Sequence, residues 1–447
     1  MLRSFRLGNH CSFADEQELL LMPAAPGDQR TVVPVTAIYG ANASGKSNLL
    51  DGLRFMQRAV IQSFARWDAD EGVTRHPFRL RTESASTPSV FVVELVVDNI
   101  PYTYGFSLND EEILEEWLYA YPKKRPRKLF ERTRDDIRFS TTIEDVKPKL
   151  ELIEELTRPN ALFLSAVAQT KLESLMPVYR WIRSQLRMRT TASPRLPLRV
   201  ADQVGRLIAR NPENLDRLVG LIQAADIGIT DLHLDETDNP RNLANAHAIE
   251  ARVAKLESAL QSTELHDRDK ILTELKELRR HRNNLVPRAT EPRFALRLQH
   301  GESNTQFELD DESAGTVSWL QLLPMVLDAL DSGHVMVVDE IDTSLHPLLT
   351  ARLVGLFQDE ATNPYGAQLV FTTHDASLLG TMLGDDVLQR DQVWFVEKNA
   401  EGASNLYPLT DFKPRKEHNT ERRYLGGSYG AVPLLDPQDF ARAVRSR

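Results

Sequence analysis

The chain has 447 residues, of which 41% are hydrophobic and 26% are charged, so it can form about two or three domains with a sizeable core. Its formal net charge of −10 argues against a protein that coats nucleic acid, and its single cysteine, Cys11, excludes a disulfide framework and a cysteine-based zinc site. The first residues lack the apolar segment of a signal peptide, and no run approaches the ~20 apolar residues that span a bilayer. We therefore expect a cytoplasmic protein with no membrane partner.

Runs of β-branched and apolar residues, separated by turn signals, predict strands along the first third of the chain. They are Leu2–Leu7, Glu18–Met22, Val32–Tyr39, Val90–Val97, Tyr102–Leu108, Ile113–Tyr121 and Lys128–Arg132. Apolar residues at helical spacing predict a helix that follows residue 47 and ends near Phe64.

The stretch from Gly40 to Ser47 matches G-x-x-x-x-G-K-[ST], and it lies between a predicted strand and a predicted helix, as a phosphate-binding loop requires. Gly40 and Gly45 allow the backbone to curl so that N–H groups face a phosphate, and the helix start adds its positive dipole end. Lys46 can meet the β- and γ-phosphates, and the Ser47 hydroxyl can ligate Mg²⁺. The predicted nucleotide-binding residues of this loop are Gly40, Ala41, Asn42, Ala43, Ser44, Gly45, Lys46, Ser47 and Asn48.

The middle of the chain is predicted to be a short buried strand, Ala161–Val167, followed by Gln169 and then mostly helices from about 171 to 290. Within this part, residues 247–285 carry apolar residues at heptad spacing among many charges, which predicts an antiparallel coiled-coil hairpin. The apolar positions are Ile249, Val253, Leu256, Leu260, Ile271, Leu275, Leu278 and Leu285. A helix packed on a globular core is the alternative.

Three basic clusters leave nucleic acid open as a ligand, although we favour solvated surface for the first two of them. They are Lys123–Lys128, then Arg180, Arg183, Arg187 and Arg189 on a predicted helix, and Lys413, Arg415 and Lys416.

The last third returns to alternating strands and helices, which predicts an α/β sheet with parallel central strands. Predicted strands are Phe294–Leu298, Thr305–Leu309, Val335–Val338, Gln368–Thr373 and Val393–Glu397, and predicted helices are Thr316–Ser332 and His346–Glu360.

Polar residues at the ends of two of these strands complete the predicted site. Asp339 is placed to hold Mg²⁺, and Glu340 is placed to polarise the attacking water. His374 is placed to contact the γ-phosphate. Ser313 and Gly315 open a helix and form a second candidate anion site, for which an ordinary N-cap by Ser313 is the alternative.

Together these motifs resemble the ABC-type ATPase head shared by SMC, RecF and OLD proteins. The chain resembles more closely the ATPases of bacterial phage defence, namely the RloA and AbiL-like group, PtuA of Septu and AriA of PARIS. The C-terminal run Tyr424–Pro433 looks like the closing motif of the RloA and AbiL-like group. The resemblance implies an α/β P-loop NTPase head with a mixed sheet, formed by residues 1–170 and 291–447, and a helical, coiled-coil insertion at 171–290.

The resemblance also implies a mechanism and cofactors, ATP and Mg²⁺. Two heads face each other head to tail, and ATP lies between the phosphate loop of one copy and Ser313 and Gly315 of the other. Glu340 acts in the closed dimer, Gln169 resembles the Q-loop glutamine that contacts Mg²⁺, and Asp342 resembles a loop that couples the two sites. Ala314 departs from the family pattern, which has glycine there.

Two functions follow from this resemblance. The first is an ATP-hydrolysing sensor or scaffold of an anti-phage, abortive-infection system, which works as a homodimer or higher oligomer, responds to a phage protein trigger and controls a separate nuclease or toxin. Asp385, Asp386 and Asp391 are too scattered for the nuclease site of OLD proteins. The second is a RecF- or SMC-like DNA-repair or recombination ATPase that binds DNA.

Overall fold

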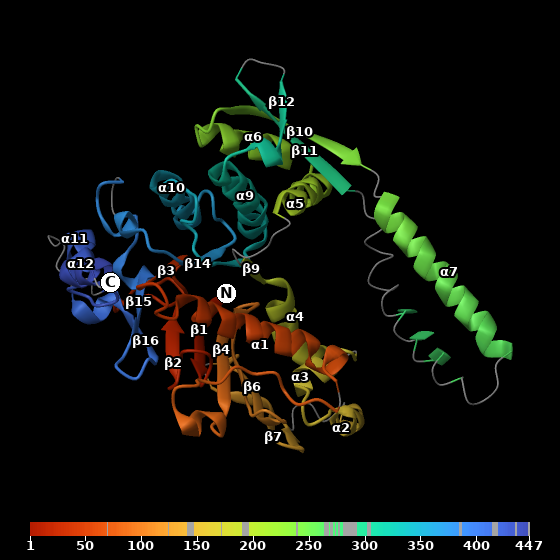
Figure 1. Cartoon of the computed structure of the whole chain (residues 1–447). Coiled ribbons are helices and arrows are strands. Elements are labelled where there is room, and N and C mark those ends of the chain that lie inside the picture. Colours follow the sequence, from red (N-terminus) through yellow and green to blue (C-terminus); the bar gives the residue numbers. More distant parts are fainter. Residues whose placement is uncertain are drawn as a thin grey trace. The chain divides into compact units, whose positions relative to one another are not determined.

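The computed structural model divides the chain into two compact units, which we name the head unit (Met1–Ala192 and Met325–Arg447) and the insertion unit (Ser193–Pro324) (Figure 1). It describes residues 1–68, 70–123, 125–140, 147–170, 172–189, 196–237, 240–262, 268, 271–272, 274–275, 278–279, 293–301, 305–383, 387–413, 419–433 and 436–445. Some residues of our predictions lie outside this part of the chain, namely Lys124, Leu285, Asp385, Asp386, Arg415 and Lys416.

The first sheet of the head unit is antiparallel throughout, with seven strands. In order across the sheet they are β2 (Gln17–Leu20), β1 (Leu2–Gly8), β4 (Ser89–Val97), β5 (Ile100–Leu108), β6 (Ile113–Ala120), β7 (Arg127–Thr133) and β8 (Asp136–Phe139). The strands predicted here from the sequence are confirmed, and β8 is an addition. Buried and partly exposed residues alternate along β6 from Glu116 to Ala120, as expected for a strand with one face on the core.

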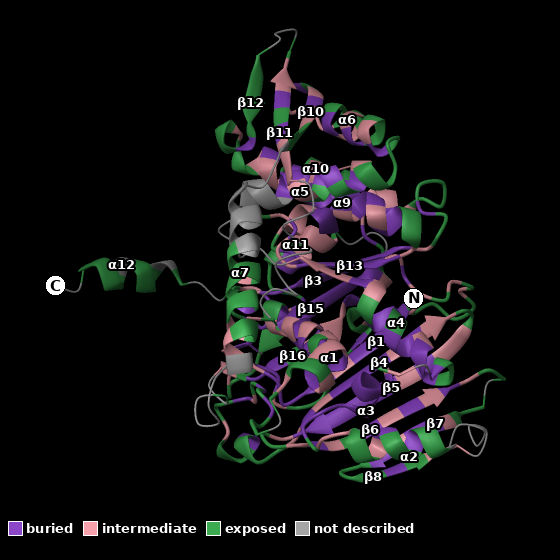
Figure 2. Ribbon diagram, turned by 90° about the vertical axis from the view of Figure 1, so that its right-hand side faces the viewer, coloured by how far each residue is buried: buried purple, intermediate pink, exposed green. Residues whose placement is uncertain are grey.

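The second sheet is the core sheet, with the order β16-β15-β3-β14-β13-β9. Its strands are β16 (Ser404–Pro408), β15 (Val393–Lys398), β3 (Val35–Tyr39), β14 (Gln368–Thr372), β13 (Val335–Val338) and β9 (Leu186–Arg189). All neighbours are parallel except β15 and β16. Strands β3, β13 and β14 are buried along their whole length (Figure 2), as expected for parallel strands covered on both faces. The predicted mixed α/β fold is confirmed.

Helix α1 (Lys46–Arg66) joins the two sheets into one core. Its buried residues recur at helical spacing, and Leu49, Leu53, Met56 and Val60 belong to the same hydrophobic cluster as Phe5 and Phe91 of the antiparallel sheet. The helix that starts at the phosphate loop is therefore fixed by the core of the unit.

The other helices of the chain are shorter or lie in the insertion unit. They are α2 (Lys147–Leu156), α3 (Phe163–Val167), α4 (Met176–Ser184), α5 (Leu196–Arg210), α6 (Asn214–Ala224), α7 (Pro240–Ser262), α9 (Ala314–Ser332), α10 (Pro347–Gln358), α11 (Thr420–Leu425) and α12 (Pro437–Arg445). The 3-10 helices are η1 (Thr82–Ala85), η3 (Glu173–Leu175), η4 (Leu309–Asp311), η5 (Ala376–Leu379), η6 (Arg390–Gln392) and η7 (Leu409–Phe412).

The predicted strand Ala161–Val167 is wrong, because these residues form the short helix α3. The reason is a buried carboxylate. Glu116 of β6 accepts hydrogen bonds from the backbone N–H groups of Phe163 (2.6 Å) and Leu164 (3.0 Å), which are the free donors of a first helical turn. The run is apolar because all sides of α3 are buried, and not because it lies in a sheet.

The prediction that Arg187 and Arg189 lie on a helix is also wrong. Both residues lie in β9, which pairs with β13 at the edge of the core sheet. The Asp339 N–H donates to the Arg189 carbonyl oxygen (3.3 Å), so the pairing of β9 with β13 continues to the residue that follows β13.

The insertion unit contains a three-stranded antiparallel sheet with the order β10-β11-β12, formed by β10 (Ile229–Thr237), β11 (Arg293–His300) and β12 (Gln306–Glu308). The sequence predicted β11 and β12 but took β10 for part of a helical region. Because β10 pairs with β11, residues 293–308 belong to the insertion unit. The sequence had predicted an insertion from residue 171 to residue 290. The unit instead begins at Ser193 and ends inside α9 at Pro324.

Helix α7 has 23 residues, about 35 Å, and most of its described side chains are exposed. Ion pairs join Arg252 to Glu274 (2.8 Å) and Arg279 to Glu257 (2.7 Å), while Val253 and Leu275 are buried. The chain therefore returns along α7, which supports the predicted hairpin; its coiled-coil character stays a prediction.

The buried Glu116 generates a prediction about stability. Besides the two N–H groups, it accepts from the Tyr104 hydroxyl (2.9 Å) and lies 3.8 Å from Arg132, and burial raises its pKa. We expect Glu116→Ala to lower the free energy of unfolding by about 3–5 kcal/mol. The change leaves the buried Arg132 guanidinium without its counter-charge and two buried backbone N–H groups without an acceptor. Urea unfolding followed by tryptophan fluorescence measures this. Glu115→Ala, at an exposed position of the same strand, is the control, and equal midpoints for the two variants would contradict the assignment.

Candidate functional site

The register of three neighbouring strands gathers the predicted site residues at one edge of the core sheet. Ile38 of β3 pairs with Thr372 of β14, and Phe371 pairs with Val338 of β13. Because the strands are parallel, the segments that follow them emerge at the same edge. These segments carry the phosphate loop, Asp339 with Glu340, and His374.

The phosphate loop has the backbone shape that its glycines allow. Gly45 has a φ of 116°, and a Cβ there would overlap the hydroxyl groups of Ser404 and Ser12. Ala43 adopts a left-handed φ of 60° without being glycine. Of the loop residues, Ala41, Asn42, Ala43 and Ser47 are wholly or partly exposed, so the loop presents its outer side to a ligand.

The Lys46 side chain is buried inside this loop. Its Nζ donates to the carbonyl oxygens of Gly40 (2.8 Å) and Ala41 (3.2 Å). Burial lowers the pKa of Lys46 to about 8, while the nearby carboxylates of Asp339, Glu340 and Asp342 act in the opposite direction. A phosphate would add the negative charge that the buried ammonium lacks.

Asp339 and Glu340 are held by Thr372, a residue that the sequence analysis had included only as part of a strand. The Thr372 hydroxyl donates to Asp339 Oδ1 (2.6 Å) and accepts from the Glu340 N–H (2.7 Å). Glu340 has a left-handed φ of 49°, a conformation that costs about 1–3 kcal/mol and clusters at functional sites. A hydroxyl inside an apolar strand was the signal that could have revealed this role.

His374 is exposed at the end of β14, and its backbone N–H donates to Asp342 Oδ2 (3.2 Å). Partial burial of the ring and the charge of Lys46 lower the pKa of His374 from its usual value. The shift favours the neutral imidazole, which keeps one N–H as a donor. Asp342 thus ties the segment after β13 to the segment after β14.

The remaining predicted residues lie elsewhere. Ser313 and Gly315 belong to the insertion unit, where Ser313 Oγ accepts from the Thr316 N–H (3.1 Å) and so caps α9. Ser313 and Ala314 are exposed, which leaves this helix start accessible. Gln169 lies in the turn after α3, so its expected position after a strand is wrong, although its predicted metal contact is unaffected by that correction.

The back of the phosphate loop rests on residues that the sequence analysis missed. Ser404 Oγ of β16 lies 2.5 Å from the Ser44 carbonyl oxygen and 2.7 Å from Ser12 Oγ. The Asn48 side chain donates to the same Ser12 oxygen (2.8 Å), so its amide points to this support. No motif marks Ser12 or Ser404 in the sequence, because only the fold brings them to the loop.

Tyr424, at the start of the C-terminal run Tyr424–Pro433, meets the first glycine of the loop. The backbone of Gly40 hydrogen-bonds the buried phenol of Tyr424, whose pKa burial raises to about 12. The Tyr424 ring packs edge-on against Tyr39 (5.5 Å between centroids) and stacks on Phe395 (5.6 Å). Residues almost 400 positions apart in the sequence therefore share one wall of the site.

The core sheet and the phosphate loop define an α/β fold of the P-loop ATPase type. Residues 35–380 match the family described as "AAA domain, putative AbiEii toxin, Type IV TA system". The match covers more than half of the chain, and the chain belongs to this family.

Among solved structures, the chain is similar to an Smc head bound to the C-winged helix domain of ScpA, with 12% identity, a TM-score of 0.42, and coverage of 92% of this chain and 99% of that chain. It is also similar to an Smc head with an extended coiled coil bound to the C-terminal domain of ScpA from Pyrococcus furiosus, with 12% identity, a TM-score of 0.39, and coverage of 92% and 97%. Similarity at this level supports no functional conclusion. The search of curated proteins gave no match. Among the helices that the structure describes, none combines the length and apolarity needed to cross a membrane.

The lowered pKa of Lys46 predicts that nucleotide affinity depends on pH. The free protein loses the Lys46 charge as the pH rises through about 8, whereas bound phosphate favours the charged form. We expect ATP to bind about tenfold more weakly at pH 9 than at pH 7, measured by calorimetry with Mg²⁺ and a non-hydrolysable analogue. Lys46→Arg stays charged over this range and is the control for other titrating groups. Equal affinity of the unaltered protein at both pH values would contradict the prediction.

The two hydrogen bonds of Thr372 predict a catalytic defect without a folding defect. Thr372→Val keeps the shape of the side chain but frees Asp339 and the Glu340 N–H, and we expect kcat for ATP hydrolysis to fall about tenfold or more. Thr36→Val is the matched control, because Thr36 is a fully buried threonine of β3 whose Oγ1 has no hydrogen-bond partner among the described residues. Equal loss of activity in both variants would show a packing effect.

Proposed function

We propose that the chain binds and hydrolyses ATP with Mg²⁺ between two head-to-tail copies and acts as the sensor or scaffold of an anti-phage, abortive-infection system that controls a separate effector. The observation that carries the ATPase part is the meeting of the phosphate loop, Asp339, Glu340 and His374 at one edge of the core sheet. The description of the family as AbiEii-type and toxin–antitoxin-related supports the defence part.

The residues of the edge fit a triphosphate with a hard divalent cation. Lys46 and the loop N–H groups meet the phosphates, and the exposed Ser47 hydroxyl and the second oxygen of Asp339 are oxygen ligands, the type that Mg²⁺ prefers. Bound Mg²⁺ would neutralise charge that develops on the phosphates. Gln169 is a further candidate for contact with the ion or its water.

Glu340 is the candidate general base, and its strained backbone fixes the direction of the carboxylate. The neutral imidazole of His374 can donate to the γ-phosphate. The exposed start of α9, with Ser313 and Gly315, would close the site from a second copy through its N–H groups and dipole. Since Ser313 Oγ already caps the helix, we assign the phosphate contact chiefly to the backbone.

The hairpin around α7 is the part that we propose to meet a phage trigger or an effector, because its described surface is charged and largely exposed. The interaction of Tyr424 with Gly40 is consistent with the closer relationship that we propose to the RloA and AbiL-like, PtuA and AriA proteins, since it joins the C-terminal run to the phosphate loop.

The alternative, a DNA-repair ATPase, has less support. Two residues of the basic clusters, Lys128 and Arg180, are neutralised by Glu131 and Glu173, at 2.9 and 2.7 Å. Binding to a DNA duplex that weakens steeply with salt would favour the alternative.

Two variants test the proposal. Lys46→Ala should abolish ATP binding, whereas Glu340→Gln should retain binding, lose about 100-fold or more in kcat, and accumulate as an ATP-dependent dimer in light scattering. Glu360→Gln, an exposed carboxylate beyond α10, is the control. Full hydrolysis by Glu340→Gln would remove Glu340 from catalysis. If phage plate equally well on cells that carry the unaltered gene and on cells that carry the Lys46→Ala gene, the defence role is refuted, and the ATPase assignment is not affected.

A further inference from the structure

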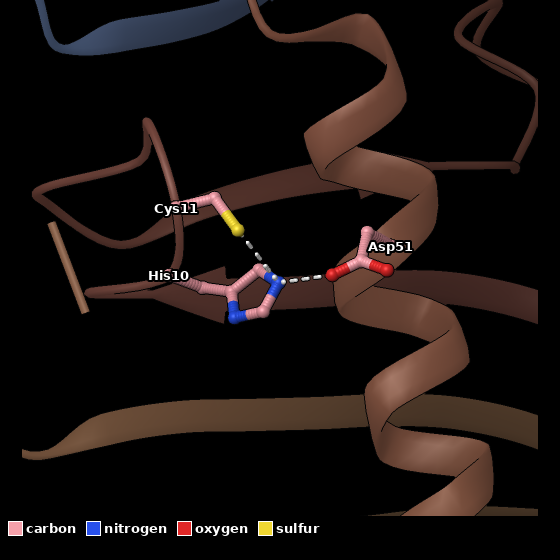
Figure 3. Close-up of side chains that lie close together, drawn as sticks. All are labelled: His10, Cys11 and Asp51. Atoms are coloured by element: carbon pink, nitrogen blue, oxygen red, sulfur yellow. Dashed lines mark hydrogen bonds and ion pairs between the residues drawn. The ribbon is translucent and has the colours of Figure 1, made fainter. Parts of the chain in front are cut away.

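Three side chains outside the nucleotide site converge on one point of the head unit (Figure 3). His10 and Cys11 lie in the turn after β1, and Asp51 lies on α1, five residues beyond Lys46. His10 Nε2 is 3.2 Å from Asp51 Oδ2 and 3.5 Å from Cys11 Sγ, and the three atoms all lie within 4.8 Å of one another.

The two separations from His10 Nε2 suit a tetrahedral metal ion, and the third pair of ligand atoms lies within 4.8 Å. Zinc binds histidine nitrogen and carboxylate oxygen at about 2.0–2.2 Å and thiolate sulfur at about 2.3 Å. Tetrahedral angles then put nitrogen and oxygen about 3.4 Å apart and nitrogen and sulfur about 3.6 Å apart. The observed distances of 3.2 and 3.5 Å agree with these values to within 0.2 Å.

Hydrogen bonds among these three side chains use a single ring nitrogen, His10 Nε2. If Nε2 carries the proton, Asp51 and the weakly accepting Cys11 sulfur share one donor; if it does not, Asp51 loses its donor from the ring. The imidazole cannot turn away, because it is fully buried and packs against Phe55 (5.9 Å between centroids) and Phe91 (5.3 Å). A cation at the shared point would satisfy all three ligand atoms.

The turn that carries two of the ligands is held in place. The Asn9 side chain donates to the carbonyl oxygens of Ser84 (2.8 Å) and Thr87 (2.6 Å), and the Cys11 N–H donates to the His76 carbonyl oxygen (2.6 Å). Asp51 Oδ1 lies 3.9 Å from Arg54, which orients the carboxylate from its other side. Such outer contacts fix metal ligands before the ion binds.

The cluster is also linked to the phosphate loop. Ser12, next to Cys11, contacts Ser404 and Asn48, and Ser404 contacts the Ser44 carbonyl oxygen. Asp51 lies on the helix that begins in the loop. An ion here would therefore join the turn after β1 to the first turns of α1.

We propose that His10, Cys11 and Asp51 bind one divalent transition-metal ion of the zinc type. The mixed nitrogen, sulfur and oxygen set favours zinc over magnesium, and the partly exposed Cys11 and Asp51 leave the fourth position open to water. The single cysteine excludes sites built from several thiolates but not a site with one.

Cobalt titration of the full, tag-free, metal-stripped chain tests the proposal, because tetrahedral Co²⁺ gives intense visible bands and a thiolate ligand adds a near-ultraviolet charge-transfer band. Cys11 is the only cysteine, so that band can arise from no other residue. We expect one equivalent of Co²⁺ to bind without nucleotide and to be displaced by Zn²⁺.

Matched variants separate this site from adventitious binding. Cys11→Ser should lose the charge-transfer band, and Asp51→Asn should weaken Co²⁺ binding at least tenfold, both with unchanged circular dichroism. His76→Ala removes a nearby exposed histidine and should change nothing. Absence of the band in the unaltered chain, or equal cobalt affinity in Asp51→Asn, would overturn the proposal. Since ATP takes no part, either result leaves the proposed ATPase function untouched.

Discussion

The parallel register of β3, β14 and β13 is the constraint on which the site depends. These strands carry no catalytic group themselves, but their shared direction brings three separated segments of the chain to one edge. The register also places Thr372 beside Asp339, so that one hydroxyl donates to the Asp339 carboxylate and accepts from the Glu340 N–H. A shift of one residue between β13 and β14 would separate them.

The phosphate loop in turn depends on support from distant parts of the chain. Ser12 and Ser404 fill the space that the missing side chain of Gly45 leaves, and the Tyr424 phenol meets Gly40. One side of the loop is therefore held by packing, and the other side is exposed. A loop held in this way can bind phosphate without reorganising. A metal ion at His10, Cys11 and Asp51 would strengthen the same support.

Buried charge recurs in the head unit, and in each case it serves the placement of a backbone. Glu116 holds the first turn of α3 through two N–H groups. Lys46 is buried among carbonyl oxygens, with its pKa lowered to about 8. Glu116 is satisfied by donors inside the protein, whereas under the proposed function a bound phosphate would complete the partners of Lys46.

The sequence by itself determined the phosphate loop, the acidic pair after β13, His374, and most strands, because each depends on residue types at short spacing. It mistook α3 for a strand, since a short apolar run that is buried on all sides has no period to reveal it. It placed Arg187 and Arg189 on a helix and missed β10, since the pairing of β9 with β13 and of β10 with β11 is long-range. Only the tertiary structure decided the roles of Thr372, Ser12, Ser404 and Tyr424, because hydrogen bonds between residues tens to hundreds of positions apart leave no local pattern.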